Sequence, residues 1–162
     1  MAEDLSIATG TKEQQYNLLT KQIAALVEGE SDTIANLANI AAALKEQFNF
    51  WWVGFYLVKH DQLVLGPFQG PVACTRIAYG RGVCGTAWKE KKTLIVDDVD
   101  NFPGHIACSS LSKSEIVIPI ILDDKCVAVL DVDSENLSHF DQIDAAYLEV
   151  ILQKVDFSKL SH

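Results

Sequence analysis

The first third of the chain has hydrophobic residues at helical spacing. Over residues 11–27, apolar positions recur three and four apart, and Gly29 suits the position just after the end of a helix. Ser31 and Asp32 can cap a second helix, whose apolar stripe extends over residues 34–48. The pattern therefore predicts two adjacent amphipathic helices joined by a short break.

The rest of the chain is richer in aromatic and β-branched residues, which favour strands. The predicted strands cover residues 50–58, 63–65, 72–78, 93–96, 115–122 and 126–133. A glycine-rich loop leads into a short helix that ends near Lys91, and Ser138-His139-Phe140-Asp141 fits a capping box before a last helix. Because most strands follow one another through short turns, we expect an α+β fold. It has a six-stranded, mostly antiparallel sheet with the terminal helices packed on one face.

Length and composition are typical of one globular domain. The chain has 162 residues, of which 49% are hydrophobic and 22% charged. We expect a flexible N-terminus over residues 1–10 and a single domain over residues 11–162. The longest nearly continuous apolar stretch, Phe50–Val58, is shorter than the roughly 18–20 residues of a membrane span, and the acidic first residues do not form a signal peptide. We therefore expect a cytoplasmic protein without membrane contact.

Charge and cysteine spacing narrow the possible partners. With 13 basic and 22 acidic residues the formal charge is −9, so the surface repels phosphate backbones and nucleic acid is not expected as a partner. The cysteines stand at positions 74, 84, 108 and 126 without a Cys-x-x-Cys pair, and the histidines lack ligand spacing, so no metal site is expected. Taken alone, each cysteine is most simply a small buried apolar side chain.

Two of the cysteines nevertheless have sequence contexts that suit chemistry. Cys84 lies in Gly-Arg-Gly-Val-Cys-Gly near a predicted helix N-terminus, where amide dipoles favour a thiolate. Cys108 lies in a long polar loop over residues 97–112, three residues after His105, which is either a proton shuttle or a plain surface residue. Cys126 begins a strand and is interpreted as structural, because buried cysteines are usually inert.

Acidic residues on the last two predicted strands form a second candidate for chemistry. Asp131 and Asp133 are two apart on one strand and so share a face, and the hairpin register places Glu115 opposite Asp133. Clustered carboxylates raise one another's pKa, so one of them can stay protonated as an acid. The alternative interpretation is a polar sheet face in water.

An aromatic pair accompanies these acids. Trp52 and Tyr56 share one face of the first predicted strand, with Gly54 between them. They either wall a small pocket for a methyl or thioether group or belong to a packed core. The residues alone leave both interpretations open.

Five motifs in order carry a resemblance to a known family. They are Trp-Val-Gly-Phe-Tyr at 52–56, Gly-Pro-Phe-Gln-Gly at 66–70, Gly-Val-Cys-Gly at 82–85, Phe-Pro-Gly-His-Ile-Ala-Cys at 102–108 and Leu-Asp-Val-Asp-Ser at 130–134. Over about Tyr16 to Leu152 the chain resembles the free methionine-(R)-sulfoxide reductases, which are stand-alone GAF domains. The resemblance implies an oxidoreductase that acts on the free amino acid.

The resemblance also implies roles for three cysteines. Cys108 attacks the sulfoxide sulfur, becomes a sulfenic acid and releases methionine. Cys84 then condenses with it to a disulfide, and Cys74 can assist or substitute; which of these disulfides accumulates is left open. Thioredoxin restores the thiols as external reductant, and no bound cofactor is expected. By the same resemblance the protein is expected to form a homodimer.

The remaining roles concern the substrate. By resemblance, Glu115, Asp131 and Asp133 hold the substrate ammonium and the sulfoxide oxygen, Trp52 faces the S-methyl group, and Tyr56 is a looser substrate contact. The group that holds the substrate carboxylate is left open. The competing interpretation is a GAF module that binds a small ligand or senses redox state without catalysis, because a fold alone does not give a function. A nucleophile, a resolving thiol and an acid in one chain favour the enzyme.

Overall fold

Two helices open the chain and form the predicted hairpin. The computed structural model describes residues 4–105 and 111–160. Helix α1 (Lys12–Val27) begins in a capping box between Thr11 and Gln14, and α2 (Thr33–Phe48) begins at Asp32, whose side chain accepts a hydrogen bond from the Ala35 amide. The break follows the prediction, because Gly29 has a φ of 77°, which glycine adopts without strain.

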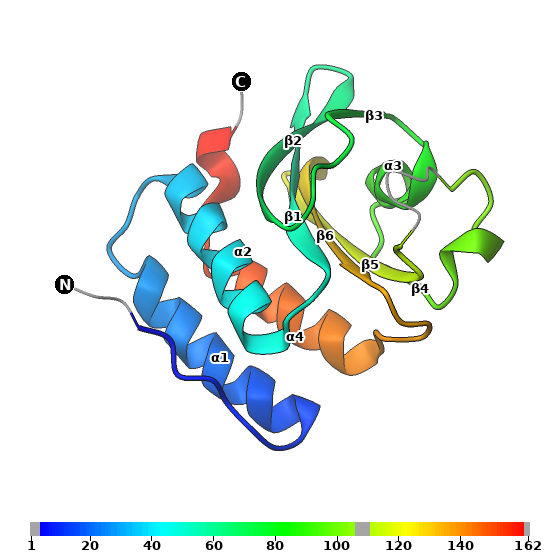
Figure 1. Cartoon of the computed structure of the whole chain (residues 1–162). Coiled ribbons are helices and arrows are strands. Elements are labelled where there is room, and N and C mark those ends of the chain that lie inside the picture. The colour runs from blue at the N-terminus through cyan, green and yellow to red at the C-terminus, as the bar shows by residue number, and fades with distance from the viewer. Residues whose placement is uncertain (1–3, 106–110, 161–162) are drawn as a thin grey trace.

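A curled six-stranded sheet makes up the middle of the molecule (Figure 1). Its strands are β1 (Trp52–Lys59), β2 (Gln62–Gln69), β3 (Arg76–Ala78), β4 (Leu94–Val96), β5 (Ser114–Leu122) and β6 (Lys125–Ser134). Their order is β3-β2-β1-β6-β5-β4, and every neighbouring pair is antiparallel. The predicted fold class, α+β with a six-stranded antiparallel sheet, is confirmed.

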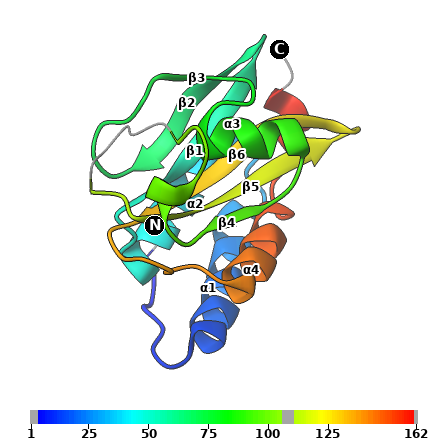
Figure 2. The same ribbon diagram turned by 90° about the vertical axis from the view of Figure 1, so that its right-hand side faces the viewer.

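Helices lie on both faces of this sheet. The hairpin α1–α2 and the last helix, α4 (Gln142–Leu152), cover one face, as expected for terminal helices (Figure 1). The short helix α3 (Gly82–Glu90) lies on the opposite face and stands in front of the sheet in Figure 2. Short 3₁₀ turns at Val99–Asn101 and Phe157–Leu160 complete the described elements. The sheet therefore separates two apolar layers, and the second layer contains the site described below.

Two predicted boundaries were wrong for identifiable reasons. Gly66 and Pro67 were expected to end a strand, but together they face the single residue Phe55 and form a bulge through which β2 continues. The capping box predicted at Ser138 is also wrong. Ser138 has a φ of 52°, and Asp141 caps α4 instead, in a capping box with Asp144.

The segment before α1 lies along the helical layer. The Ser6 amide donates to Gln22 Oε1 at 2.7 Å, and the Ala8 amide donates to Gln47 Oε1 at 2.8 Å. The expected flexible N-terminus over residues 1–10, and the single domain over residues 11–162, stay predictions. Within the described ranges, no helix is both long and apolar enough to cross a membrane.

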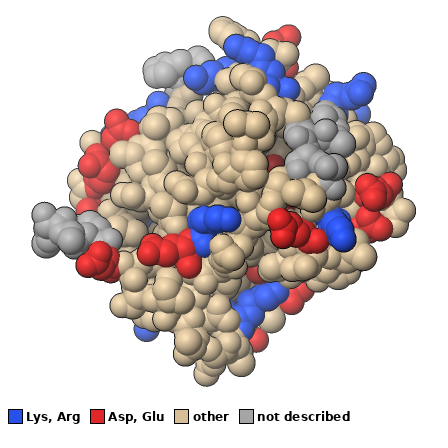
Figure 3. Space-filling model, viewed as in Figure 1, with Lys and Arg blue, Asp and Glu red and all other residues tan. Residues whose placement is uncertain are grey.

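The charged residues are interspersed on the face of the molecule that Figure 3 displays. Acidic and basic side chains alternate there around larger areas of other residues, without gathering into one basic patch.

A buried polar contact joins α1 to α4 under the sheet. The Tyr16 hydroxyl donates to Asp144 Oδ1 at 2.6 Å, and Lys12 Nζ lies 2.7 Å from Asp144 Oδ2. Asp144 is 1% exposed, so both contacts replace water that the carboxylate has lost. The ring of Tyr16 also stacks on Tyr147, with centroids 5.1 Å apart.

We expect Tyr16→Phe to lower the free energy of unfolding by about 1.5–3 kcal/mol, because it removes a hydrogen bond to a buried charged group. Tyr147→Phe is the matched control, since its hydroxyl bonds Asn17 at the surface; we expect a change below about 0.5 kcal/mol. Urea denaturation of both variants measures the difference. Equal losses in the two variants would contradict the stabilising role of the Asp144 contact.

Candidate functional site

A small cavity lies between α3 and the sheet, on the face opposite α1, α2 and α4. It is lined by aromatic, acidic and thiol side chains together. Its walls come from β1, β3, β5, β6, the start of α3 and the loops around them. The lining residues are Trp51, Trp52, Tyr56, Val72, Ala73, Ile77, Arg81, Gly82, Val83, Cys84, His105, Ser112, Glu115, Asp131 and Asp133.

Strand register brings the acidic residues together in this cavity. Asp133 of β6 pairs with Glu115 of β5 on one side and with Trp52 of β1 on the other. Asp131 follows two residues along β6 on the same face, beside Gly54 of β1. The structure therefore places Trp52 and all three sequence-predicted acids in one cavity.

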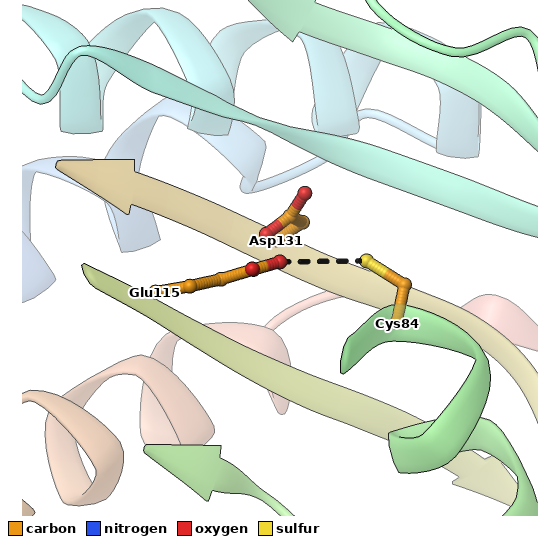
Figure 4. A group of neighbouring side chains, drawn as sticks. All are labelled: Cys84, Glu115 and Asp131. Atoms are coloured by element: carbon orange, nitrogen blue, oxygen red, sulfur yellow. Dashed lines mark hydrogen bonds between the residues drawn. The ribbon is translucent and has the colours of Figure 1, made fainter. Parts of the chain in front are cut away.

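Cys84 reaches the same cluster from α3. Figure 4 shows the Cys84 thiol and the carboxyl groups of Glu115 and Asp131 pointing toward one another from three different elements. The thiol donates a hydrogen bond to Glu115 Oε1 over 3.9 Å. Cys84, Glu115 and Asp131 are each at most 7% exposed. Water therefore does little to solvate charge at this point of the cavity.

Burial raises the pKa of every acid in the cluster. The pKa of Glu115 rises to about 8, first because the carboxyl is buried and second because Asp133 lies beside it. Burial likewise holds the pKa of Asp131 and of Asp133 well above the usual range, with the neighbouring acids adding to the effect. Within residues 4–105 and 111–160 the ion pairs involve Lys12, and none reaches these acids. The cluster thus holds protons at neutral pH and favours a cation.

The expected thiolate at Cys84 was wrong. Cys84 is the third residue of α3, so the helix dipole acts on it as predicted. Burial outweighs the dipole, however, and the nearby Asp131 and Glu115 add to it, so the pKa of this thiol lies well above its usual range. Cys84 is therefore a neutral hydrogen-bond donor in this form of the protein.

The indole of Trp52 forms an apolar wall of the cavity. A Cβ atom added to Gly54 would lie 2.8 Å from the indole, and one added to Gly70 would lie 2.6 Å from it, so both glycines leave room for the ring. The indole stacks on Phe68 and Tyr56 at centroid distances of 5.2 and 6.0 Å. Trp52 and Tyr56 thus both line the cavity and pack with their neighbours, so the two sequence interpretations describe one arrangement.

The same two aromatic residues hold the loop that carries Cys74. Trp52 Nε1 donates to the Pro71 carbonyl at 3.0 Å, and the Tyr56 hydroxyl donates to the Cys74 carbonyl at 2.8 Å. Cys74 is disulfide-bonded, whereas Cys84 and Cys126 carry free thiols. The backbone of Cys74 is therefore anchored to β1, a contact that the sequence pattern did not indicate.

The two remaining cysteines, Cys108 and Cys126, have different positions relative to the cavity. Cys108 falls in the segment 106–110, outside the described residues, but His105 and Ser112 on either side of that segment line the cavity. Cys126 belongs to the apolar layer, where its Sγ contacts the Ala128 carbonyl at 3.2 Å and burial raises its pKa to about 11. These features agree with the structural interpretation of Cys126.

Sequence reasoning missed two features of the site. Ser112 Oγ donates to Asp133 Oδ1 at 3.3 Å, although nothing distinguished it from the other serines of its loop. Arg81 and Gly82 line the cavity where α3 begins, and no side chain caps that helix. An uncapped helix N-terminus favours a negatively charged group. The glycine-rich loop over residues 80–85 is the sequence signal for this second feature, beside its role as the context of Cys84.

Comparisons with known proteins agree with this architecture. The model of the GAF domain family matches residues 31–157. GAF domain-containing protein A of Dictyostelium discoideum is 64% identical, covering 96% of this chain and 99% of that protein. The free methionine-R-sulfoxide reductase of Escherichia coli is 43% identical, covering 91% of this chain and 94% of the enzyme.

A solved structure extends the comparison to three dimensions. The X-ray structure of free methionine-R-sulfoxide reductase from Neisseria meningitidis, in complex with its substrate, is 51% identical, with a TM-score of 0.92 and coverage of 98% of both chains. The expectation of a GAF fold is confirmed by these matches. The chain belongs to the GAF domain family, within its group of free methionine-R-sulfoxide reductases, which are oxidoreductases.

Proposed function

We propose that the protein reduces free L-methionine-(R)-sulfoxide to L-methionine in the cavity between α3 and the sheet. One observation carries the proposal: three acids line a small cavity beside an aromatic wall, and no ion pair in the described structure neutralises them. A free amino acid supplies the missing cation as its ammonium group. A methionine within a polypeptide lacks that ammonium, so the proposal restricts the substrate to the free amino acid.

Each part of the substrate has a counterpart in the cavity. Glu115, Asp131 and Asp133 bind the ammonium and the sulfoxide oxygen, and the indole of Trp52 faces the S-methyl group. Tyr56 is the looser contact beside the indole. The uncapped N-terminus of α3, with the Arg81 guanidinium, is the candidate for the substrate carboxylate. The cavity lining thus offers a counterpart for both charged groups of the substrate.

The chemical step needs a thiolate and a proton donor. In the proposed step the Cys108 thiolate attacks the sulfoxide sulfur while a protonated carboxyl of the cluster gives its proton to the sulfoxide oxygen. The resulting hydroxyl passes to the cysteine sulfur as the bond between the two sulfurs breaks, which leaves a cysteine sulfenic acid and methionine. A Glu115 pKa of about 8 supports this role, because most of that carboxyl is protonated at pH 7. The position of His105 and Ser112 in the cavity lining supports a nucleophile between them in the sequence.

A second thiol must then remove the sulfenic acid. Condensation of the sulfenic acid with a thiol gives a disulfide and water, and thioredoxin returns both sulfurs to thiols by oxidising its own pair. The disulfide-bonded state of Cys74 supports Cys74 as this resolving cysteine. The buried, neutral thiol of Cys84 is a poorer nucleophile, so we now prefer Cys74 over the sequence-based choice of Cys84.

Thioredoxin recycling requires a reducing compartment, so we propose the cytoplasm as the site of action.

We also propose a homodimer formed through the helical layer. Leu18, Ile34 and Val150 on α1, α2 and α4 are each about 40% exposed or more, and a second copy could cover such apolar side chains. Light scattering of the purified chain measures the mass, and a monomer at micromolar concentration would contradict the dimer.

The decisive experiment is turnover of free methionine-(R)-sulfoxide with thioredoxin as reductant, measured as methionine released. We expect turnover of the (R) epimer and little turnover of the (S) epimer or of a peptide-bound sulfoxide. Cys108→Ser should release no methionine even in a single turnover, whereas Cys126→Ala should stay within a few-fold of the natural protein. Binding without turnover by the unchanged chain would instead favour a ligand-sensing module.

We expect Cys74→Ser to keep the first turnover and to lose most thioredoxin-driven cycling, because the sulfenic acid then lacks its resolving partner. Cys84→Ser should lose less of the cycling rate. Methionine released in single-turnover and in multiple-turnover assays separates the two steps. The reverse order, with cycling abolished in Cys84→Ser alone, would assign Cys84 as the resolving cysteine.

We expect Asp133→Asn to reduce kcat/KM by at least about 100-fold, the lower range of what general acid catalysis contributes. Activity of the unchanged chain should fall as the pH rises through about 8, where Glu115 loses its proton. Glu135→Gln, at an exposed position directly after β6, is the control and should not change kcat/KM. Normal turnover by a folded Asp133→Asn protein would exclude the acid cluster from catalysis.

We also expect Glu115→Gln to stabilise the fold at alkaline pH. The pKa of Glu115 rises from 4.5 to about 8 on folding, so its contribution is most favourable below about pH 4.5 and is lost as the pH rises through 8. The variant should therefore exceed the natural protein by at least about 1 kcal/mol at pH 9 and by much less at pH 5. Urea denaturation at both pH values measures this, and a gain independent of pH would contradict it.

A further inference from the structure

We propose that the Cys84 thiol and the carboxyl groups of Glu115 and Asp131 together bind a divalent ion of borderline softness, Zn²⁺, which excludes the amino-acid substrate from the cavity. Binding of the ion stands on the geometry alone. Its competition with substrate rests on the proposed function, because it requires that the same acids hold the substrate ammonium. The ion would act as an inhibitor and would have no part in the reaction.

The three side chains are close enough to one another to coordinate a single ion. Each offers one ligand atom, and these atoms all lie within 4.8 Å of one another. Cys84 Sγ and Glu115 Oε1 are 3.9 Å apart. Tetrahedral zinc with Zn–S near 2.3 Å and Zn–O near 2.1 Å separates its ligand atoms by roughly 3.4–3.7 Å. Small side-chain rotations therefore suffice to close the site.

A second, independent observation indicates a missing ligand. Asp131 is 7% exposed, and its Oδ1 is buried without a hydrogen-bond partner. Leaving a buried polar atom unpaired costs about 1–3 kcal/mol, and more for a charged group. The carboxyl lies within the cluster that Figure 4 shows, so a cation held by its neighbours would supply the absent partner.

The ligand types select zinc over the hard cations. Ca²⁺ prefers six to eight oxygen ligands and Mg²⁺ an octahedral shell with several waters, whereas one thiol and two carboxyls in a buried site match neither. Zinc accepts sulfur and oxygen together in fourfold coordination. Three protein ligands leave its fourth position for water or for the Asp133 carboxyl, which lines the same cavity.

The cysteine and histidine spacings indicated no metal site, so this one was not expected. Its three ligands are separated by 31 and 16 positions and belong to α3, β5 and β6, so no short motif contains them. Register and helix placement bring them together only in the folded chain.

The test is calorimetric titration of the full chain with Zn²⁺ in the form that has Cys74 disulfide-bonded, so that Cys84 and Cys126 are the free thiols of the described chain. We expect one ion per chain and at least about a 10-fold loss of affinity in both Cys84→Ser and Glu115→Gln. The matched controls Cys126→Ala and Glu135→Gln should bind as the natural protein does. Co²⁺ should give a thiolate charge-transfer band that only Cys84→Ser loses.

No binding, or equal losses in the variants and their controls, would overturn the site. Mg²⁺ displacing Zn²⁺ at similar concentration would overturn the assignment of a thiol ligand. Circular dichroism of Cys84→Ser and Glu115→Gln establishes that both are folded during the titration.

A second titration in the presence of free methionine tests the competition. We expect the apparent zinc affinity to fall as methionine is added, and Zn²⁺ affinity that is unchanged by saturating methionine overturns the competition. The outcomes distinguish the two proposals. A chain that reduces the sulfoxide without binding zinc overturns this inference alone. A chain that binds zinc at Cys84 without releasing methionine overturns the proposed function alone.

Discussion

Three acids share one sheet face, two of them buried, without an ion-pair partner in the described chain, and the site depends on this constraint. Register along β5, β6 and β1 puts Glu115 and Asp133 side by side, so neither can avoid the other by turning away. Protons retained on the carboxyl groups relieve the resulting repulsion. A positively charged ligand therefore finds the acidic groups already assembled, because folding has brought them together.

On the opposite face of the sheet, by contrast, a buried acid has partners within the chain. Asp144 is also buried, but Tyr16 and Lys12 satisfy its carboxylate, so that it stabilises the packing of α1 against α4. The difference between a structural and a functional carboxyl in this molecule is thus the presence of a partner within the chain. Local sequence alone does not distinguish the two kinds, since Asp131 and Asp144 each lie between two apolar residues.

The sequence predicted the helical hairpin, the antiparallel sheet and the shared face of Asp131 and Asp133, because these follow from periodicity and from short turns. It could not predict that β2 continues through Gly66 and Pro67, since a bulge depends on the partner strand. The thiolate assigned to Cys84 failed for a related reason: a helix dipole is visible in sequence, but burial beside two acids is not. The anchoring of Cys74 by Tyr56 was equally invisible, because it joins residues 18 positions apart through a backbone carbonyl.

The shape of the sheet has a consequence for the behaviour of the protein at high concentration. Both outer strands, β3 and β4, are only three residues long, and beyond β3 the outer side of β2 contains Pro67, which has no amide hydrogen to donate. Exposed strand edges are templates on which other chains can add, and short strands and prolines interrupt them. The sheet that holds the site therefore offers little edge for intermolecular β-pairing. Aggregation of the protein should accordingly start from unfolded chains and not from the native state.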